Sequence, residues 1–469
     1  MKHTTIIILS IVIVALSGCT RQPALHITDE PFRSVYHHSP AQNWMNDPNG
    51  MFYDDAAQVW HLYYQHNPFG TTWGPMHWAH ATSTDLIHWE QHPIALYPDS
   101  LGTIFSGSIV IDRTNTAGFG ENAVIAIFTQ SEICGQHQSI AFSLDGGMTF
   151  TKYEGNPVLK GDIADFRDPK VCWDEQTNRW LMTLACQQEI RFYSSANLRE
   201  WQYESSFGTG YGAHGGVWEC PELLQFADQY VLLVSLNPGG IFGGSATQYF
   251  VGNWDGHTFT CIDEPEETKW LDYGKDNYST FTWHNALDHR IVSLGWMSNW
   301  QYANQLPTVA FRSQNTIARE LSLYIDDAGE TRIRVLPSPE SMAIKGKPTK
   351  QLGDVVIVEL ELNGDAIITL SNDQGEQVTM TLDVAAQTFS MDRTQAGDNS
   401  FSPDFAAVTT APLFVHHTPC TILLFIDHCS IEAFDANGYW AMTNLVFPSA
   451  PYNHIDVQGG KVTIYDVNI

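Results

Sequence analysis

The hydrophobic positions of this chain fall into short runs with strand-like spacing. Such runs occupy residues 59–64, 123–129, 180–185, 230–236 and 290–296, and turn-forming residues flank each of them. The 3.6-residue spacing of an amphipathic helix is scarce. We therefore predict an all-β protein.

Four short segments repeat one plan at a regular distance. They are "STDLIHWE" (83–90), "SLDGGMTF" (143–150), "SANLREWQ" (195–202) and "NWDGHTFT" (253–260). In each, an Asp or Asn opens a turn at 85, 145, 197 or 255, and a Trp or Phe follows four or five residues later. The steps of 60, 52 and 58 residues fit a four-stranded propeller blade. We expect the Asp or Asn to cap a hairpin turn, the aromatic ring to pack between blades, and residues 270–336 to supply a fifth blade.

The composition of the chain changes after this region. Residues 334–353 are rich in Pro, Lys and Gly, and we predict a linker over 337–353. Alternating apolar runs such as "VVIVELEL" and "TILLFIDHCSIEAF" follow. The predicted fold is thus a five-bladed β-propeller over residues 30–336, followed by a C-terminal β-sandwich over 354–469.

The first residues have the pattern of an export signal. Lys2 and His3 precede an apolar run over 6–16, which is too short to span a bilayer comfortably. Leu-Ser-Gly-Cys then resembles a bacterial lipobox, which predicts a lipoprotein signal peptide over 1–19 and a lipid on Cys19. A plain signal peptide or an uncleaved anchor is the alternative. We expect an exported protein, lipid-anchored to the bacterial cell envelope and facing the periplasm or held at the outer membrane.

Composition and charge narrow the choice of partners. The chain has 52 acidic residues against 23 Lys and Arg, a net charge of −29, which argues against binding nucleic acids or anionic membranes. Aromatic residues make up 12%, with 15 Trp, as suits flat sugar rings and β-rich cores alike. Without Cys19, seven Cys remain, with no C-x-x-C pair, and the 19 His show no metal-ligand spacing. We expect few or no disulfides and no Cys-based metal site.

Three acidic residues stand among apolar neighbours just before a proline. Asp47 lies in "WMNDPNG", Asp168 in "FRDPKV" and Glu219 in "GVWECPE". They precede the repeat turns at 85, 197 and 255 by 38, 29 and 36 residues. Each is therefore predicted on the innermost strand of a different blade, so that the three carboxylates meet in one central pocket.

Such a pocket suits glycoside hydrolysis. That reaction needs one carboxylate as nucleophile, or as a base for water, and one carboxyl group as general acid. Glu219, between Trp218 and Cys220, suits the acid, because burial and like charges raise a carboxyl pKa. Arg167 beside Asp168 predicts that Asp168 stays ionised.

The motifs resemble those of glycoside hydrolase family 32, the levanases, inulinases and invertases that cleave β-fructofuranosides. They are WMNDPNG, "YYQHNPFG" (63–70), "WGPMHWAHATSTDLIHW" (73–89), "FSGS" (105–108), RDP and ECP, in this order. The resemblance extends from about residue 36 to the C-terminus. It implies a five-bladed propeller followed by a β-sandwich, a retaining mechanism, and no metal or cofactor.

The resemblance also assigns roles to individual residues. Asp47 matches the nucleophile that attacks C2 of a terminal fructose, Glu219 the acid/base and Asp168 the transition-state stabiliser. "GWMSNWQYANQLPT" (295–308) looks like the exo-acting inulinase and levanase branch. The substrate-binding positions implied are Trp44, Asn46, Gln65, Trp73, Phe105, Ser106, Arg167, Tyr278 and Trp296.

The expected activity is release of terminal, non-reducing β-D-fructofuranosyl residues from levan and inulin, with sucrose as a further candidate substrate. One alternative is a propeller glycosidase of another type, arabinanase-like or sialidase-like; an inverting enzyme would hold its carboxylates further apart. Another is a fructan-binding lipoprotein without catalytic activity.

Overall fold

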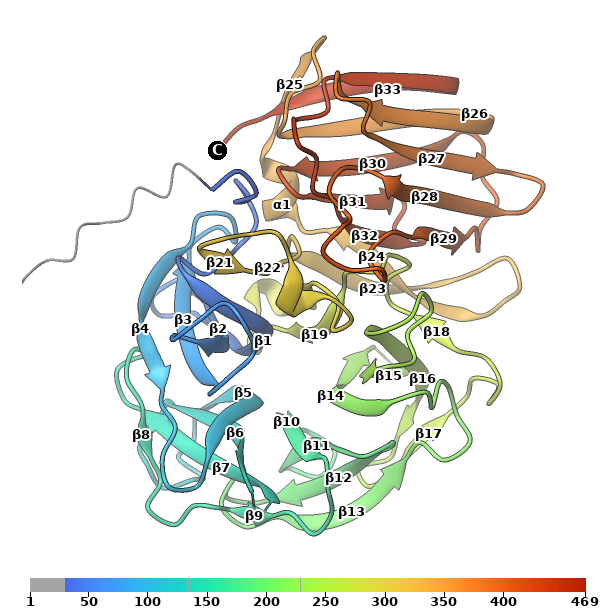
Figure 1. The fold of residues 1–469 in the computed structure, drawn as a ribbon. Coiled ribbons are helices and arrows are strands. Elements are labelled where there is room, and N and C mark those ends of the chain that lie inside the picture. The colour runs from blue at the N-terminus through green and yellow to red at the C-terminus, as the bar shows by residue number, and fades with distance from the viewer. Residues whose placement is uncertain (1–29, 134, 228) are drawn as a thin grey trace, which may run out of the picture.

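The computed structural model describes residues 30–133, 135–227 and 229–469. Five β-sheets surround a central axis, and a further β domain packs against one side of this ring (Figure 1). Helix in these residues is limited to α1 (Pro339–Ala343) and the 3-10 turns η2 (Leu287–His289) and η3 (Ala303–Gln305). The predicted all-β propeller and sandwich are thus confirmed. The signal peptide over 1–19, with Cys19, lies outside the described residues.

Each propeller blade is an antiparallel sheet whose first strand faces the axis (Figure 1). From the axis outward, blade one consists of β1 (Asn43–Asp54), β2 (Val59–Asn67), β3 (His77–Ser83) and β4 (Glu90–Leu96), and blade two of β5 (Thr103–Asp112), β6 (Ala123–Glu132), β7 (Gly135–Ser143) and β8 (Thr151–Lys152). Blade three consists of β10 (Phe166–Asp174), β11 (Arg179–Cys186), β12 (Glu189–Ser195) and β13 (Gln202–Phe207), and blade four of β14 (Val217–Phe226), β15 (Gln229–Asn237), β16 (Ala246–Trp254) and β17 (Phe259–Cys261). Blade five consists of β19 (Tyr278–Thr282), β20 (Val292–Met297), β23 (Arg319–Ile325) and β24 (Thr331–Pro337). Short strands β9 (Leu159–Lys160), β18 (Lys269–Trp270) and β22 (Gln314–Asn315) extend blades two, four and five. Strand β21 (Phe311–Arg312) pairs with β1 in parallel and closes the ring between the last blade and the first.

The repeated turns join the third and fourth strands of their blades. The side-chain oxygens of Asp85, Asp145, Asn197 and Asp255 accept backbone N–H groups two to four residues downstream, at 2.7–3.0 Å. Asp326 does the same in the fifth blade at 2.8–2.9 Å. The sequence repeat missed this last turn because no aromatic residue follows it. The predicted turn caps are confirmed, and all five blades share them.

Aromatic residues after these turns fill the spaces between blades. Trp89 packs on the cluster between blades five and one, and Phe150 on the one between blades one and two. Trp201 packs between blades two and three, and Phe259 between blades three and four. The cluster between blades four and five continues into the second domain through Phe425 and other apolar side chains. Interblade cores therefore fix each innermost strand relative to its neighbours.

The second domain is a two-layered sandwich built on two long, bent strands, β26 (Val356–Ser371) and β33 (His454–Val467). Their first-layer neighbours are β25 (Lys345–Thr349), β30 (Cys420–Asp427), β31 (Ser430–Asp435) and β32 (Ala441–Leu445); the other layer holds β27 (Gln377–Asp383), β28 (Thr388–Gln395) and β29 (Val408–Pro412). An apolar core fills the space between the layers.

The segment predicted as a linker, 337–353, is ordered structure. It contains α1, capped by the Ser338 hydroxyl, and β25, which pairs with β33 of the sandwich. Its Pro, Lys and Gly content fits an exposed edge strand as well as a linker, because Pro and Lys are common at sheet edges. Strand β25 thus extends the sandwich, while α1 contacts the fifth blade, where the Ser341 hydroxyl donates to the Ala318 carbonyl at 2.9 Å.

No helix of the described residues is long and apolar enough to cross a membrane. Six cysteines in these ranges are free thiols, namely Cys172, Cys186, Cys220, Cys261, Cys420 and Cys429.

Candidate active site

The five innermost strands are irregular where they face the axis. Register shifts interrupt β1 between Met45 and Pro48, β10 between Arg167 and Lys170, and β14 between Glu219 and Glu222; β5 and β19 are shifted in the same way. A regular strand sends successive side chains to opposite faces, whereas a bulge lets neighbouring residues point the same way. Pro169 and Pro221 fall inside these interruptions and Pro48 lies at the end of one, positions where the missing proline N–H is tolerated. This explains the Asp-Pro and Glu-Cys-Pro motifs.

A cavity of about 300 Å³ lies where these strands meet. It is lined by Asn46, Asp47, Gln65, Trp73, Phe105, Ser106, Gln136, Asp165, Arg167, Asp168, Glu219, Asn237 and Trp300. The three carboxylates predicted to converge therefore do so, from blades one, three and four. Gln136, Asp165 and Asn237 were not predicted, since they come from loops and strand ends whose sequences carry no distinctive pattern.

Trp44 and Trp296 lie behind the cavity wall. Both are fully buried, and neither lines the cavity. They pack against Trp300, with ring centroids 5.7 and 4.8 Å away, and it is Trp300 that borders the cavity. The expectation that Trp296 walls the sugar site is therefore corrected: Trp296 belongs to a strand of blade five, while Trp300 lies in the loop after it.

Asp47 and Asp168 are joined through Cys220. The Cys220 thiol lies 3.5 Å from Asp47 Oδ2 and 3.6 Å from Asp168 Oδ2, and its backbone N–H donates to Asp168 Oδ2 at 3.1 Å. The Ser106 hydroxyl donates to Asp47 Oδ2 at 2.6 Å. Asp47 Oδ1, in contrast, is buried and has no hydrogen-bond donor among the described residues. One oxygen of Asp47 is thus held in place, and the other is left without a partner.

Glu219 is held by an arginine and a tyrosine. Arg167 donates to Glu219 Oε1 from two nitrogens, at 2.9 and 3.1 Å, and the Tyr278 hydroxyl donates to Oε2. Trp218 points away from the cavity, with its indole nitrogen bonded to a backbone carbonyl and its ring in the core between blades three and four. Trp218 therefore does not desolvate the Glu219 carboxyl group, contrary to the sequence prediction.

Arg167 lies closer to Glu219 than to its own neighbour. Its Nε is 4.0 Å from Asp168 Oδ2, while its Nη1 binds Asp165 Oδ1 at 2.5 Å. Burial raises the pKa of Asp168 to about 7, against the opposing effect of Arg167 and with the help of Glu219 and Asp47. Burial also raises the pKa of Asp47, although the hydrogen bond from Ser106 opposes it. Burial therefore opposes the expected effect of Arg167 on Asp168, and the guanidinium group is directed mainly toward Glu219.

A buried ion pair ties the same strands together below the cavity. Lys170 Nζ lies 2.8 Å from Glu222 Oε1 and donates to the Thr282 carbonyl at 2.8 Å. Glu222 also accepts from the Thr282 N–H at 2.9 Å. These residues come from β10, β14 and β19, so the pair fixes the positions of the strands that carry Asp168, Glu219 and Tyr278.

This arrangement provides carboxylates in two different settings within one small cavity. One is the Asp47 carboxylate, which Ser106 holds through Oδ2, and the other is the Glu219 carboxyl group, which an arginine and a tyrosine orient. Such a pair is what glycosidic bond cleavage by acid and nucleophile requires. Within the described ranges, the one group of His, Cys and Asp side chains with metal-ligand spacing lies in the second domain, away from this cavity.

Comparison with known proteins gives the same picture along the whole chain. The model of the glycosyl hydrolases family 32 N-terminal domain matches residues 37–337, and that of the family 32 C-terminal domain matches residues 320–469. A levanase of Bacillus subtilis (strain 168) is 41% identical over 456 residues, covering 90% of this chain and 67% of the relative. An extracellular exo-inulinase of Aspergillus awamori is 34% identical over 506 residues, covering 94% of each protein. The crystal structure of an exo-inulinase from Aspergillus awamori superimposes with a TM-score of 0.87 at 33% identity, covering 94% of this chain and 99% of the other. The chain therefore belongs to glycosyl hydrolase family 32.

Proposed function

We propose that this protein is a retaining, exo-acting β-fructosidase that releases fructose from the non-reducing ends of fructans such as levan and inulin, and from sucrose. The observation that carries the proposal is the meeting of Asp47, Asp168 and Glu219 in one cavity of about 300 Å³. This volume lies at the small end of ligand sites, as suits a single terminal sugar. The levanase and exo-inulinase relatives act on such polymers according to their names.

Asp47 is the proposed nucleophile. Its Oδ2 is held by the Ser106 hydroxyl at 2.6 Å, and its Oδ1 has no donor among the described residues. The Asp47 carboxylate would attack C2 of the terminal fructose and form a fructosyl ester as the leaving oxygen departs. Retention would need the Asp47 and Glu219 carboxyl groups about 5 Å apart.

Glu219 is the proposed acid/base. It would give its proton to the departing oxygen and then take a proton from the water that cleaves the ester. The Tyr278 hydroxyl and Arg167 fix the direction of its carboxyl group. Asp168, the proposed stabiliser, would bind hydroxyls of the fructosyl ring. Its bond from the Cys220 N–H holds it against the cavity.

The remaining predicted residues would shape the sugar site. Asn46, Gln65, Trp73, Phe105, Ser106 and Arg167 line the cavity and are proposed to contact the fructosyl unit. Trp300, rather than the predicted Trp296, lines the cavity and is proposed to contact the sugar. Membership of family 32 argues against the arabinanase-like and sialidase-like alternatives.

We propose that the protein is exported, because its relatives include exo-inulinases that are named extracellular. Lipid attachment at Cys19 rests on the lipobox-like sequence. Replacing Cys19 with Ala should move the protein from the membrane fraction to the soluble one, and an unchanged distribution would contradict the anchor.

A product profile tests the activity. The protein without its first 19 residues would be incubated with levan, inulin or sucrose, and early products separated by chromatography. Fructose alone from the start is expected, and the relative rates would name the preferred linkage. Oligosaccharides as first products would show endo cleavage. No release from any substrate, with tight fructan binding, would favour a binding protein.

A further inference from the structure

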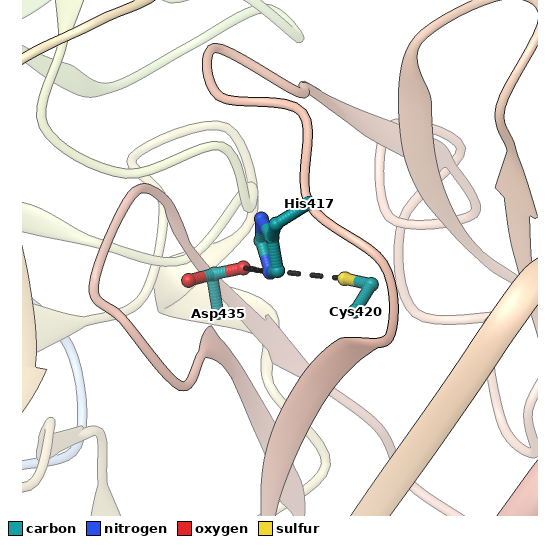
Figure 2. Close-up of side chains that lie close together, drawn as sticks. All are labelled: His417, Cys420 and Asp435. Carbon is teal, nitrogen blue, oxygen red and sulfur yellow. Dashed lines mark hydrogen bonds and ion pairs between the residues drawn. The ribbon is translucent and has the colours of Figure 1, made fainter.

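Three potential metal ligands converge in the second domain, far from the carboxylate cavity. His417 lies in the loop between β29 and β30, Cys420 begins β30, and Asp435 ends β31 (Figure 2). His417 Nε2 is 3.2 Å from Asp435 Oδ2, Cys420 Sγ is 4.0 Å from that oxygen, and all three donor atoms lie within 4.8 Å of one another. Ligand atoms of a tetrahedral zinc ion are separated by roughly 3.3–3.8 Å, so small side-chain movements would bring these three to one ion.

The surroundings orient each donor toward the others. His417 Nδ1 faces the Val415 carbonyl at 3.4 Å, the kind of partner that metal-binding histidines use on their second nitrogen. With the proton on Nδ1, the Nε2 lone pair faces Asp435 and the side-chain amide of Asn437, whose Nδ2 is 3.4 Å from Nε2. Asp435 Oδ1 accepts the Asn437 N–H at 2.7 Å, which leaves Oδ2 toward the histidine and the thiol.

Apart from a proton on His417, no positive charge from the described side chains reaches this arrangement. A histidine lone pair and a carboxylate oxygen at 3.2 Å repel each other unless a proton or a cation lies between them. Cys420 and Asp435 are buried, and in the described part of the chain no Lys or Arg forms an ion pair with Asp435. A divalent cation would neutralise the buried carboxylate and bind the thiolate.

The site also has an entrance. A cavity of about 150 Å³ borders His417 and Cys420, with Leu362, Leu382 and Leu413 among its other walls. It leaves room for a water molecule as a fourth ligand.

We propose that His417, Cys420 and Asp435 bind one Zn²⁺ ion, with water in the fourth position. A thiolate, an imidazole and a carboxylate form a donor set that suits zinc better than calcium or magnesium. The ion would fix the loop that leads from β29 in one layer of the sandwich to β30 in the other, and so stabilise the domain. The proposal is independent of the reaction at the propeller axis.

Cobalt and zinc binding to the purified, chelator-treated protein test this. Co²⁺ should bind one equivalent and produce the near-ultraviolet charge-transfer band of a cobalt–thiolate bond, and Zn²⁺ should displace it. Cys420→Ser should abolish the band, while His417→Ala and Asp435→Asn should each weaken binding about tenfold or more. Zn²⁺ should raise the thermal midpoint of the parent but not of these three variants.

Two matched controls separate the site from its neighbours. His416, the adjacent histidine, pairs with Asp327 at 2.6 Å on the surface, so His416→Ala should bind cobalt like the parent. Cys261→Ser removes a thiol of blade four and should keep the band. Circular dichroism would check that every variant is folded. Absence of a thiolate band in the parent, or a band that survives Cys420→Ser in a folded protein, would overturn the proposal.

Discussion

Two buried clusters of charged residues differ in how their charges are paired. At the propeller axis, the carboxyl groups of Asp47, Asp168 and Glu219 line one cavity with Arg167. Of these three groups, Arg167 donates hydrogen bonds only to Glu219. At the junction of the two domains the charges alternate along a chain of contacts. The members are Asp272, Arg319, Glu432, His37 and Asp427, and each cation there contacts two carboxylates.

The pairing of the charges, rather than their burial, determines whether carboxyl pKa values in a cluster are lowered or raised. Burial alone would raise the carboxyl pKa of Asp47, Asp168, Asp272, Asp427 and Glu432. At the junction, Arg319 outweighs burial and lowers the pKa of Asp272 and Glu432, and His37 does so for Asp427. At the axis, the pKa of Asp47 and Asp168 is raised. The junction charges thus stabilise the native fold, while the ionised forms of Asp47 and Asp168 are held at a cost in stability.

The backbone shows the same contrast. Asp168 and Cys220 have φ of 63° and 50°, in the left-handed region that is unfavourable for side chains. At the junction, β30 and β31 pair without a register shift. The left-handed backbone at Asp168 and Cys220 therefore accompanies the bulges that direct neighbouring side chains into one cavity.

The largest expected effect is at the axis. Asp47→Asn keeps the shape of the side chain but removes the attacking charge, so kcat for fructose release should fall about 10⁴-fold or more. The thermal midpoint should not fall, because a buried, poorly paired carboxylate has been removed. Initial rates on levan and inulin with a melting curve would measure both. Activity within tenfold of the parent would contradict the proposed role.

At the junction, the corresponding change should affect stability instead. Glu432→Gln leaves Arg319 and His37 without their shared carboxylate, and should lower the free energy of unfolding by about 3–5 kcal/mol. The rate of fructose release by folded protein should stay near that of the parent. Urea unfolding would measure the loss.

A surface pair supplies the control for this loss. Glu361→Gln breaks the exposed contact with Lys461, at 3.5 Å, and should cost under about 0.5 kcal/mol. Equal losses in the two variants would mean that the junction network has no special weight.

His37 makes the junction sensitive to alkaline pH. Burial lowers its pKa, but the hydrogen bonds to Asp427 and Glu432 outweigh this and raise it to about 9 from 6.5. The folded state holds the His37 proton more tightly than the unfolded state does. The contribution of protonated His37 to stability is therefore complete below pH 6.5 and is lost as the pH rises through 9. His37→Gln should flatten that part of the stability profile by roughly 2–3 kcal/mol. A profile as steep as that of the parent would assign the loss to other groups.

Asp168 should have its effect at lower pH. Its pKa is raised from 3.8 to about 7, so the folded state binds more protons than the unfolded state between these values, and stability falls as the pH rises. Asp168→Asn removes this penalty, and its gain in stability should grow from near zero at pH 4 to roughly 1–3 kcal/mol above pH 7. A stability difference that is independent of pH would contradict the shift.

Much of the fold was predictable from local patterns. The turn at Asp85 and its three counterparts gave the blade period, since capping and interblade packing act over a few residues. The carboxylates at 47, 168 and 219 were found because Asp-Pro and Glu-Cys-Pro among apolar residues are unusual in a strand. Strand β25, within the predicted linker 337–353, was not predicted, because its pairing with β33 joins residues more than one hundred positions apart.

The details of the site depended on such distant contacts. Nothing near Cys220 in the sequence indicates that its thiol lies between Asp47 and Asp168. The direction of Arg167, toward Glu219 on another blade, follows from the bulge in β10. Trp296 and Trp300 are equally apolar in the sequence, and only the packing of blade five shows which of them borders the cavity.

The most direct test of the account is the configuration of the first fructose released. Carbon-13 NMR of a levan or inulin digest, recorded before the sugar equilibrates, would identify the anomer from its C2 signal, because C2 of fructose carries no hydrogen. Two displacements, by Asp47 and then by water, predict the β-anomer of fructose first, with the α-anomer appearing only by later equilibration. The α-anomer as first product would mean a single displacement by water, and would contradict the assignment of Asp47 as nucleophile.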